Sequence, residues 1–254
     1  MNNHSHEFAG CNVVITGASP DFGETLALAF GRMGARLFLS SKTLEEAETT
    51  RALVARECAG VEAYAFPGDL CMPGQIRELV DEIASRTETV DILVNNGSYW
   101  LPGTLADHAA SEISPVIEST FRGAVMLLQA LMPLIRRSGR ADIVNVVARC
   151  GWPGDRHSTS SETFSASKAA LAAFGQRMRE ELRGSGIRVL QIYPPNFHNT
   201  SLLDAKQWNE RRGSDEERLP SARNVMDAIL FGLRQDRICS IDELVLSNTR
   251  TDIL

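Results

Sequence analysis

The chain has 254 residues, a formal net charge of −6 and 43% hydrophobic residues, as expected for one soluble α/β domain. Its acidic balance argues against a nucleic-acid partner and gives an anionic membrane little to attract. No apolar run is long enough to cross a membrane, and the first residues lack the features of a signal peptide. The five cysteines have no C-x-x-C spacing, so we expect reduced thiols, a cytoplasmic location and no metal site.

Strand-like and helix-like segments alternate along the whole chain. Short apolar runs predict strands at residues 11–16, 36–40, 62–66, 90–94, 142–147, 187–192 and 244–247. Helical spacing of apolar residues predicts helices at residues 24–33, 44–59, 75–86, 114–137 and 164–184. This alternation predicts a single-domain Rossmann fold of class α/β, with a doubly wound parallel sheet of about seven strands and helices on both faces.

The domain boundaries follow from the same pattern. Residues 1–8 are polar and are expected to form a disordered N-terminal tail, and residues 9–254 to form the Rossmann-type domain. The irregular stretch 194–220 is predicted to lie beyond the carboxyl ends of the strands, where it would act as a mobile lid over a ligand.

The first strand ends in a glycine-containing turn, Thr16–Gly23. Glycines at a strand-to-helix turn let the backbone approach a pyrophosphate, and the helix N-terminus adds N–H donors. Two residues weaken the pattern. Asp21 brings a negative charge that would repel a phosphate unless it turns outward, and Pro20 removes one N–H group.

Five ordered motifs make the chain resemble the short-chain dehydrogenase/reductase family over roughly residues 9–250. The glycine motif T-G-x-x-x-G-x-G is met at Thr16, Gly17 and Gly23 in the turn after the first strand, with Asp21 in place of the middle glycine. The others are the acidic residue Asp69, the N-N-A-G motif as Asn95-Asn96-Gly97-Ser98, the Y-x-A-S-K motif as Phe164–Lys168, and the P-G motif as Pro194-Pro195 followed by Thr200. The resemblance implies an NAD(P)(H)-binding oxidoreductase that acts on a small apolar carbonyl or alcohol.

The resemblance also implies which residues would contact the nucleotide. They are Gly17, Ser19, Phe22, Gly23, Lys42, Asp69, Leu70, Asn95, Gly97, Lys168, Pro194 and Thr200. No acidic residue stands at Ser40 or Ser41, where an NAD-selective carboxylate would bind the ribose 2′-hydroxyl, and Lys42 follows directly. These residues favour NADP(H) over NAD(H).

The catalytic positions of the family are substituted in this chain. The proton-transferring tyrosine aligns with Phe164, the serine with Ala148 and the helical asparagine with Thr120, whereas the lysine is retained as Lys168. The alignment assumes about three extra residues before Phe164. Because phenylalanine has no proton to donate, the standard mechanism of the family is not expected to run.

Other side chains are weak candidates for the missing acid. Tyr99, which follows the N-N-G-S stretch, and Asp155 and His157 in the loop before Phe164 carry protons, but each is as readily explained as a loop or wall residue. Cys150 is expected to be a buried, inert thiol. The aromatic residues Trp100, Trp152 and Phe164 indicate either an apolar pocket or ordinary core packing.

Three functions remain open at this point. The first is an oxidoreductase with a remodelled active site, and the second is a catalytically silent ligand-binding or regulatory member of the fold. The third is a non-redox lyase or isomerase. The resemblance also implies a homodimer or homotetramer formed by the helices near residues 105–137 and 164–184, where Val125, Leu128 and Met132 face either a second copy or the sheet.

Overall fold

A seven-stranded parallel sheet forms the frame of the molecule in the computed structural model, which describes residues 7–155, 159–210 and 219–249. The strands are, in chain order, β1 (Asn12–Thr16), β2 (Arg36–Ser41), β3 (Ala63–Pro67), β4 (Ile92–Asn95), β5 (Asp142–Val146), β6 (Arg188–Tyr193) and β7 (Glu243–Val245). All pairings are parallel, in the order β3-β2-β1-β4-β5-β6-β7. The predicted doubly wound Rossmann sheet is therefore confirmed.

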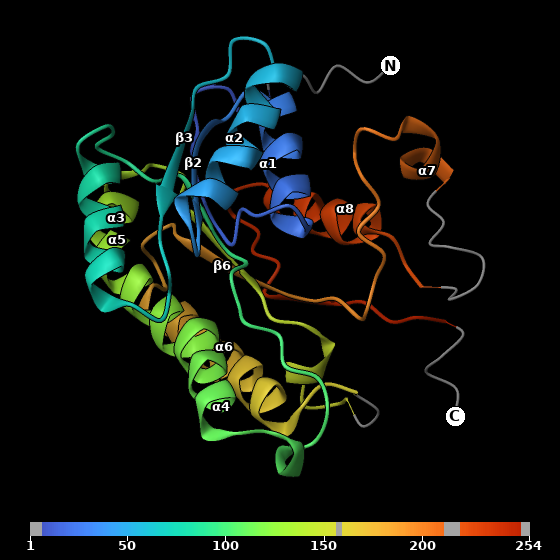
Figure 1. Ribbon diagram of the computed structural model, residues 1–254. Coiled ribbons are helices and arrows are strands. Elements are labelled where there is room, and N and C mark those ends of the chain that lie inside the picture. Colours follow the sequence, from blue (N-terminus) through green and yellow to red (C-terminus); the bar gives the residue numbers. More distant parts are fainter. Residues whose placement is uncertain (1–6, 156–158, 211–218, 250–254) are drawn as a thin grey trace.

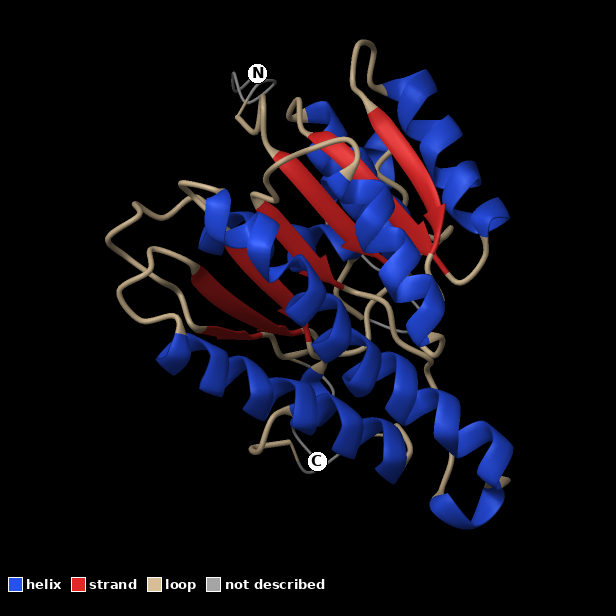
Figure 2. Cartoon of the chain, turned by 90° about the vertical axis from the view of Figure 1, so that its left-hand side faces the viewer, coloured by secondary structure: helices blue, strands red, loops and turns tan. Residues whose placement is uncertain are grey.

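Helices cover both faces of this sheet (Figure 1 and Figure 2). The helices are α1 (Phe22–Arg32), α2 (Leu44–Glu57), α3 (Pro73–Ala84), α4 (Ala110–Ile117), α5 (Ala124–Arg137), α6 (Glu162–Glu181), α7 (Ala205–Glu210) and α8 (Ala222–Leu233), with short turns η1 (Leu105–Asp107) and η3 (Arg149–Gly151). Helices α1, α2 and α8 pack on one face, and α3, α5 and α6 pack on the other.

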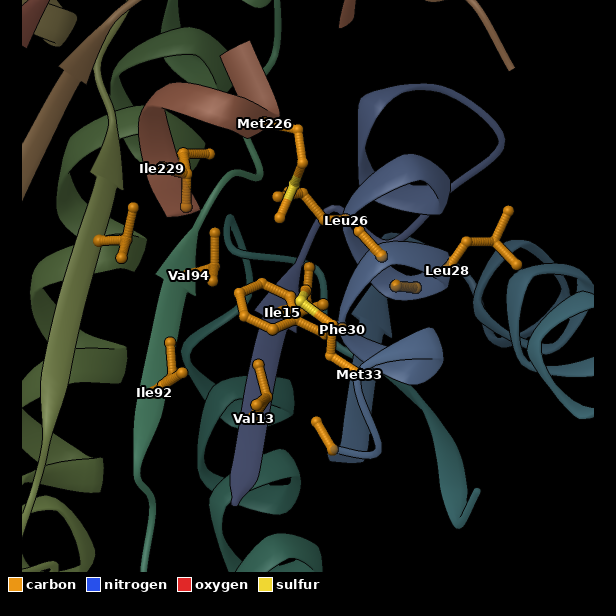
Figure 3. Close-up of a cluster of buried hydrophobic side chains, with 14 of the residues drawn as sticks. Val13, Ile15, Leu26, Leu28, Phe30, Met33, Ile92, Val94, Met226 and Ile229 are labelled. Atoms are coloured by element: carbon orange, nitrogen blue, oxygen red, sulfur yellow. The ribbon is translucent and has the colours of Figure 1, made fainter. Parts of the chain in front are cut away.

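The alternation of side chains along β1 shows how the two cores form. Val13 and Ile15 point toward α1 and α8, where they meet residues such as Phe30 and Met226 (Figure 3). Val14 points to the opposite face and packs in the core beneath α3 and α5. Because both faces are covered, the strand is apolar throughout.

The long helical region predicted at residues 114–137 is interrupted. Helix α4 starts earlier, at Ala110, and a π-helical segment, η2 (Glu118–Gly123), joins it to α5. The sequence pattern did not reveal this segment, which packs so closely against Leu70 that a Cβ on Gly123 would lie 2.3 Å from the Leu70 carbonyl oxygen. The remaining predicted strands and helices differ from the structure by one to three residues at their ends.

The packed domain begins before residue 9. Phe8 is buried against Phe30, with ring centroids 5.3 Å apart, and its N–H donates to the Met33 carbonyl. Glu7 forms an ion pair with Arg234 at 2.7 Å. Phe8 therefore belongs to the domain and not to the predicted tail, of which residues 1–6 lie outside the described residues.

Strands β1 and β4 are neighbours in the sheet. The chain proceeds outward from β1 to β2 and β3 on one side, and from β4 to β5, β6 and β7 on the other, so the direction of the strand order reverses between β1 and β4. In open parallel sheets, ligands bind beyond the carboxyl ends of the strands at such a switch point. The turns that follow β1, β4, β5 and β6 meet at this edge and carry most of the predicted site residues.

Candidate active site

Hydrogen bonds join the turn after β1 to the turn after β4. The Thr16 hydroxyl accepts the backbone N–H groups of Asn96, at 3.1 Å, and Gly97, at 3.0 Å. In return, the Asn96 side-chain amide donates to the carbonyls of Thr16 and Gly17. Asn96 was not among the predicted site residues, although it stands inside the N-N-G-S motif, and it holds the glycine turn in place.

The two glycines of the turn after β1 are required by close packing. Gly17 has φ = 61°, and a Cβ atom there would lie 2.7 Å from the Cα of Gly97. A Cβ on Gly23 would lie 1.9 Å from the Gly17 carbonyl oxygen. No other residue fits at either position without moving the backbone.

Helix α1 starts directly after this turn with no side chain capping its first amides. Its N-cap residue, Asp21, makes no capping hydrogen bond and has an exposed side chain. The N–H groups of Phe22 and Gly23 lie in the first turn of the helix, where no intrahelical acceptor exists. The start of α1 is therefore an anion-attracting end, from which the Asp21 carboxylate is free to turn away into water.

Two serines and a lysine stand at the carboxyl end of β2. Ser40 is buried, and its hydroxyl has no partner within the described residues. The Ser41 hydroxyl donates to the carboxylate of Glu46, which also caps the start of α2 through the Thr43 N–H. Lys42 is exposed at this end.

One carboxylate oxygen of Asp69, the acidic residue after β3, already accepts a hydrogen bond within the chain. Oδ1 of Asp69 accepts the N–H of Cys71 at 2.9 Å, and the Asp69 N–H donates to Gln75. Leu70 is buried beside it, with its carbonyl close to Gly123 of η2. Leu70 thus lies close to Gly97 in the turn after β4.

The buried amide of Asn95 points along the sheet. Its Nδ2 donates to Oδ1 of Asn145, the residue paired with it on β5, at 2.9 Å, whereas its own Oδ1 has no partner in the described part of the chain. The next residue in the same register, Gln191 on β6, donates to Glu243 on β7. Asn95 therefore supports the sheet through a row of polar residues that sequence analysis missed.

Lys168 is almost completely buried, with 4% of its surface exposed. Its Nζ donates to the carbonyl of Val146, the last residue of β5, at 2.8 Å and lies 5.5 Å from the centre of the Phe164 ring. Burial lowers the pKa of Lys168 to about 8, and the nearby Cys150 acts in the opposite direction. The amine is therefore close to the midpoint of its titration at neutral to mildly alkaline pH.

Phe164 occupies a small apolar cluster. It packs with Leu101 and Val116, and the partly buried Ala148 and Cys150 lie against the same group. Its N–H donates to the hydroxyl of Ser161, the N-cap of α6. The Phe164 ring is thus held in place by its packing, and it carries no hydroxyl group.

Ala148 has an unusual backbone conformation, with φ = 92° and ψ = 151° at the junction between β5 and η3. It is the one residue other than glycine with a positive φ in the described chain. This region of φ/ψ space is occupied almost only by glycine and costs about 1–3 kcal/mol. The strain lies beside the cluster of Leu101, Val116 and Phe164, against which Ala148 packs.

Cys150, predicted to be a buried and inert thiol, is half-buried in the structure. Burial raises the pKa of Cys150, and the hydroxyls of Ser160 and Ser165 together with Lys168 act in the opposite direction. The higher pKa leaves little thiolate at neutral pH, and the thiolate is the nucleophilic form.

Thr120 and Thr200 each bury a hydroxyl that has no partner among the described residues. Thr120 lies within the π-helical segment η2, and such segments often occur at functional sites. Thr200 follows β6, and its N–H donates to the His198 carbonyl. Pro194, buried at the end of β6, accepts the N–H of Arg149.

The other candidate residues that the structure describes are exposed or have other packing or ion-pair partners. Tyr99 is 46% exposed and Trp100 is 58% exposed. Trp152 packs in a separate cluster with Val147 and Tyr193, so the aromatic residues do not line one pocket. Asp155 pairs with Arg149 at 3.8 Å, and His157 lies outside the described residues.

Within the described residues, no three histidine, cysteine or acidic side chains come together as a metal-binding group. In the same part of the chain, no helix is both long enough and apolar enough to cross a membrane.

The pattern of residues at the switch point agrees with a family model, described as short chain dehydrogenase, that matches residues 11–211. The chain belongs to the short-chain dehydrogenase/reductase family. A curated relative, the ketoacyl reductase HetN of Nostoc sp., is 29% identical over 194 residues, which span 76% of this chain and 66% of HetN.

Solved structures share the fold at lower identity. A metagenomic short-chain oxidoreductase in complex with NADP is 23% identical, with a TM-score of 0.77 over 95% of this chain and 98% of the other. An NAD⁺-bound xylitol dehydrogenase is 20% identical, with a TM-score of 0.79 over 95% and 99%. Both confirm the architecture of the domain.

Proposed function

We propose that the chain binds NADP(H) and transfers hydride between this nucleotide and a small apolar carbonyl compound or alcohol. The observation that carries the proposal is the glycine turn after β1. There, Gly17 packs against Gly97 and the first amides of α1 are uncapped. Such a turn suits a pyrophosphate, because its backbone can approach the phosphate oxygens and its N–H groups can bind them.

The residues at the switch point fit a dinucleotide. The amides of Ser19, Phe22 and Gly23 would hold the pyrophosphate, and Asp69 and Leu70 would flank the adenine. At the nicotinamide end, Gly97, Lys168, Pro194 and Thr200 would line the site. The partnerless hydroxyl of Thr200 supports this assignment, since a buried donor without a partner is costly unless a ligand satisfies it. When bound, the nucleotide supplies or accepts the hydride.

Selectivity for NADP(H) over NAD(H) would come from the end of β2. Lys42 is exposed there and carries the positive charge that a 2′-phosphate needs. The one carboxylate hydrogen-bonded to Ser41, that of Glu46, is already committed to capping α2. No acidic residue stands at position 40 or 41, so the 2′-position would have no dedicated carboxylate partner there.

The active site would be non-standard. Phe164 and Ala148 stand where the family places its tyrosine and serine, and Thr120 stands at the asparagine position. None of the three offers a titratable proton. Tyr99 and His157 remain predicted substitutes, but the exposure of Tyr99 makes it a poor general acid.

A second candidate is a silent ligand-binding or regulatory protein. One observation favours it: Phe164 is packed against Leu101 and Val116, so the catalytic position of the family is filled by apolar side chains. This candidate predicts ligand binding without any redox turnover.

We also propose a cytoplasmic homo-oligomer that pairs through α6. The outer side of this helix presents Ala166, Ala169 and Ala173, which are exposed at helical spacing and would let two backbones approach closely. Leu128 and Met132 pack toward the sheet, so they are not available for pairing. Sedimentation of the parent chain and of Ala169→Arg tests this, since the variant should be a monomer.

Calorimetric titration with NADPH and NADH tests the proposed function. We expect micromolar binding of NADPH and weaker binding of NADH. Gly17→Ala should abolish binding, because its Cβ atom collides with Gly97. The matched control is Gly74→Ala, since Gly74 lies in α3 with nothing within 4 Å of an added Cβ. Failure of the parent chain to bind either nucleotide at millimolar concentration would contradict the proposal.

A further inference from the structure

The environment of Lys168 differs from that of a lysine held by an acidic partner. Within the described residues, the structure gives its Nζ one hydrogen-bond acceptor, the Val146 carbonyl, and the titratable neighbour that acts on the amine is the thiol of Cys150. An ammonium group carries three N–H donors, so two of them are left for a ligand. A buried cation with so few partners is costly to keep charged.

The surroundings of the amine are mostly apolar. The Phe164 ring lies on its own helix, and η3 packs so closely that a Cβ on Gly151 would lie 2.8 Å from the Cβ of Lys168. From η3, Cys150 is the titratable group that acts on the lysine, and Asp155 acts in turn on Cys150. On β5, the neighbour is the neutral Val146 carbonyl.

This setting makes the amine a usable acid. Burial lowers the pKa of Lys168 to about 8. A general acid works best when its pKa lies near the working pH, because it is then still protonated and yet releases the proton readily. Neither Phe164 nor Ala148 competes for this role, since neither carries a proton to give.

We propose that Lys168 donates the proton directly to the carbonyl oxygen of the substrate. The inference rests on the proposed NADPH-dependent function. As the carbonyl carbon receives hydride, the π electrons of the C=O bond move to oxygen and take a proton from the Lys168 ammonium. The products are an alcohol and the oxidised nucleotide. The neutral amine regains its proton from solvent before the next turnover, and in the reverse direction the amine accepts the proton.

The titration of Lys168 can be measured without any nucleotide. The chain has three lysines, Lys42, Lys168 and Lys206, so protein labelled with ¹³C-lysine should give three Cε signals by NMR. We expect one signal to titrate near pH 8 and to vanish in Lys168→Met. The exposed Lys42 and Lys206 serve as internal controls, because their two signals should remain in Lys168→Met. A Lys168 signal that titrates with the other two would overturn the inference.

Rates of a single turnover test the proton transfer itself. With saturating NADPH and an activated probe, 9,10-phenanthrenequinone, the rate should fall about tenfold per pH unit above pH 8. Lys168→Arg keeps the charge but has a pKa too high for proton donation, so its rate should fall by at least about 100-fold while NADPH still binds. Lys206→Arg makes the same change at an exposed site and should behave like the parent.

The outcomes separate the two proposals. A flat pH profile in the parent chain, or undiminished turnover in Lys168→Arg, would overturn the role of Lys168 and leave nucleotide binding intact. The pH profile of the parent chain tests the role of Lys168 without any variant, so the test holds even where Lys168→Arg does not fold. A parent chain that binds no NADPH would overturn the proposed function and this inference together.

Discussion

The ammonium nitrogen of Lys168 lies 5.5 Å from the centre of the Phe164 ring, one helical turn away on α6. A cation at this distance from a ring face is stabilised by about 0.5–2 kcal/mol. The contact holds the amine beside a side chain that has no proton of its own. The chemistry available at this point of the fold therefore depends on the lysine.

Restoring the two missing hydroxyls should create a conventional proton donor. The double variant Phe164→Tyr/Ala148→Ser adds an acid and a hydrogen-bond donor at positions already packed for similar volumes. We expect the rate of NADPH-dependent carbonyl reduction to rise by about 10²–10⁴-fold. Steady-state kinetics on one probe substrate measure this. An unchanged rate, with NADPH bound equally well, would show that these positions are not catalytic.

The buried amine should make stability depend on pH in a defined direction. The pKa of Lys168 is about 8 in the folded chain, against an ordinary value of 10.5 for an exposed lysine. Between these values the unfolded chain binds more protons, so the free energy of unfolding should rise with pH in this window. Between pH 8 and pH 10, the parent should gain about 2–3 kcal/mol relative to Lys168→Met.

Urea denaturation at several pH values measures this gain. The exposed Lys206→Met provides the control and should differ from the parent by a constant amount across the same range. A constant difference for Lys168→Met as well would mean that the amine titrates normally.

Relieving the backbone strain at Ala148 should stabilise the protein. Glycine adopts φ = 92° without penalty, so Ala148→Gly removes about 1–3 kcal/mol of strain and costs about 0.5–1 kcal/mol in chain entropy. We expect a net gain of about 1 kcal/mol, seen as a rise in Tm of about 2–4 °C. The same change at Ala173, which is exposed within α6, should instead destabilise the fold. Equal losses at both positions would refute the assignment of strain.

Lys42 should control which nucleotide is preferred. Lys42→Ala removes an exposed charge at the end of β2, and we expect NADPH to bind about tenfold more weakly, equivalent to about 1.4 kcal/mol. Binding of NADH should stay the same, because it has no 2′-phosphate. High salt should shrink the difference, since it screens exposed charges. An equal loss for both nucleotides would point to a general effect on the site.

Much of the fold could be predicted from the sequence because its signals are local. The β-branched runs that became β1 and β5 and the glycine turn at Gly17 each follow from residues close together in the chain. The π-helical segment around Thr120 could not be predicted, since it depends on how η2 packs against Leu70 and α6.

The burial and hydrogen bonding of the site residues could not be predicted from the sequence either. The position of Lys168 was visible in the Y-x-A-S-K pattern, but its burial and its bond to the Val146 carbonyl arise from η3, which folds back over α6. Likewise, nothing in the residue type of Ala148 indicates a positive φ. The row of Asn95, Asn145 and Gln191 became apparent only once the register of the strands placed these residues side by side.

Transfer of deuterium from NADPH labelled at C4 of the nicotinamide to a carbonyl probe tests the central claim most directly. Mass spectrometry of the alcohol product reads the result in a single experiment on the unmodified chain. We expect an alcohol with one deuterium on the former carbonyl carbon, formed faster at pH 7 than at pH 9.5. Bound nucleotide with no deuterium in any product would contradict it and would identify the chain as a silent member of its family.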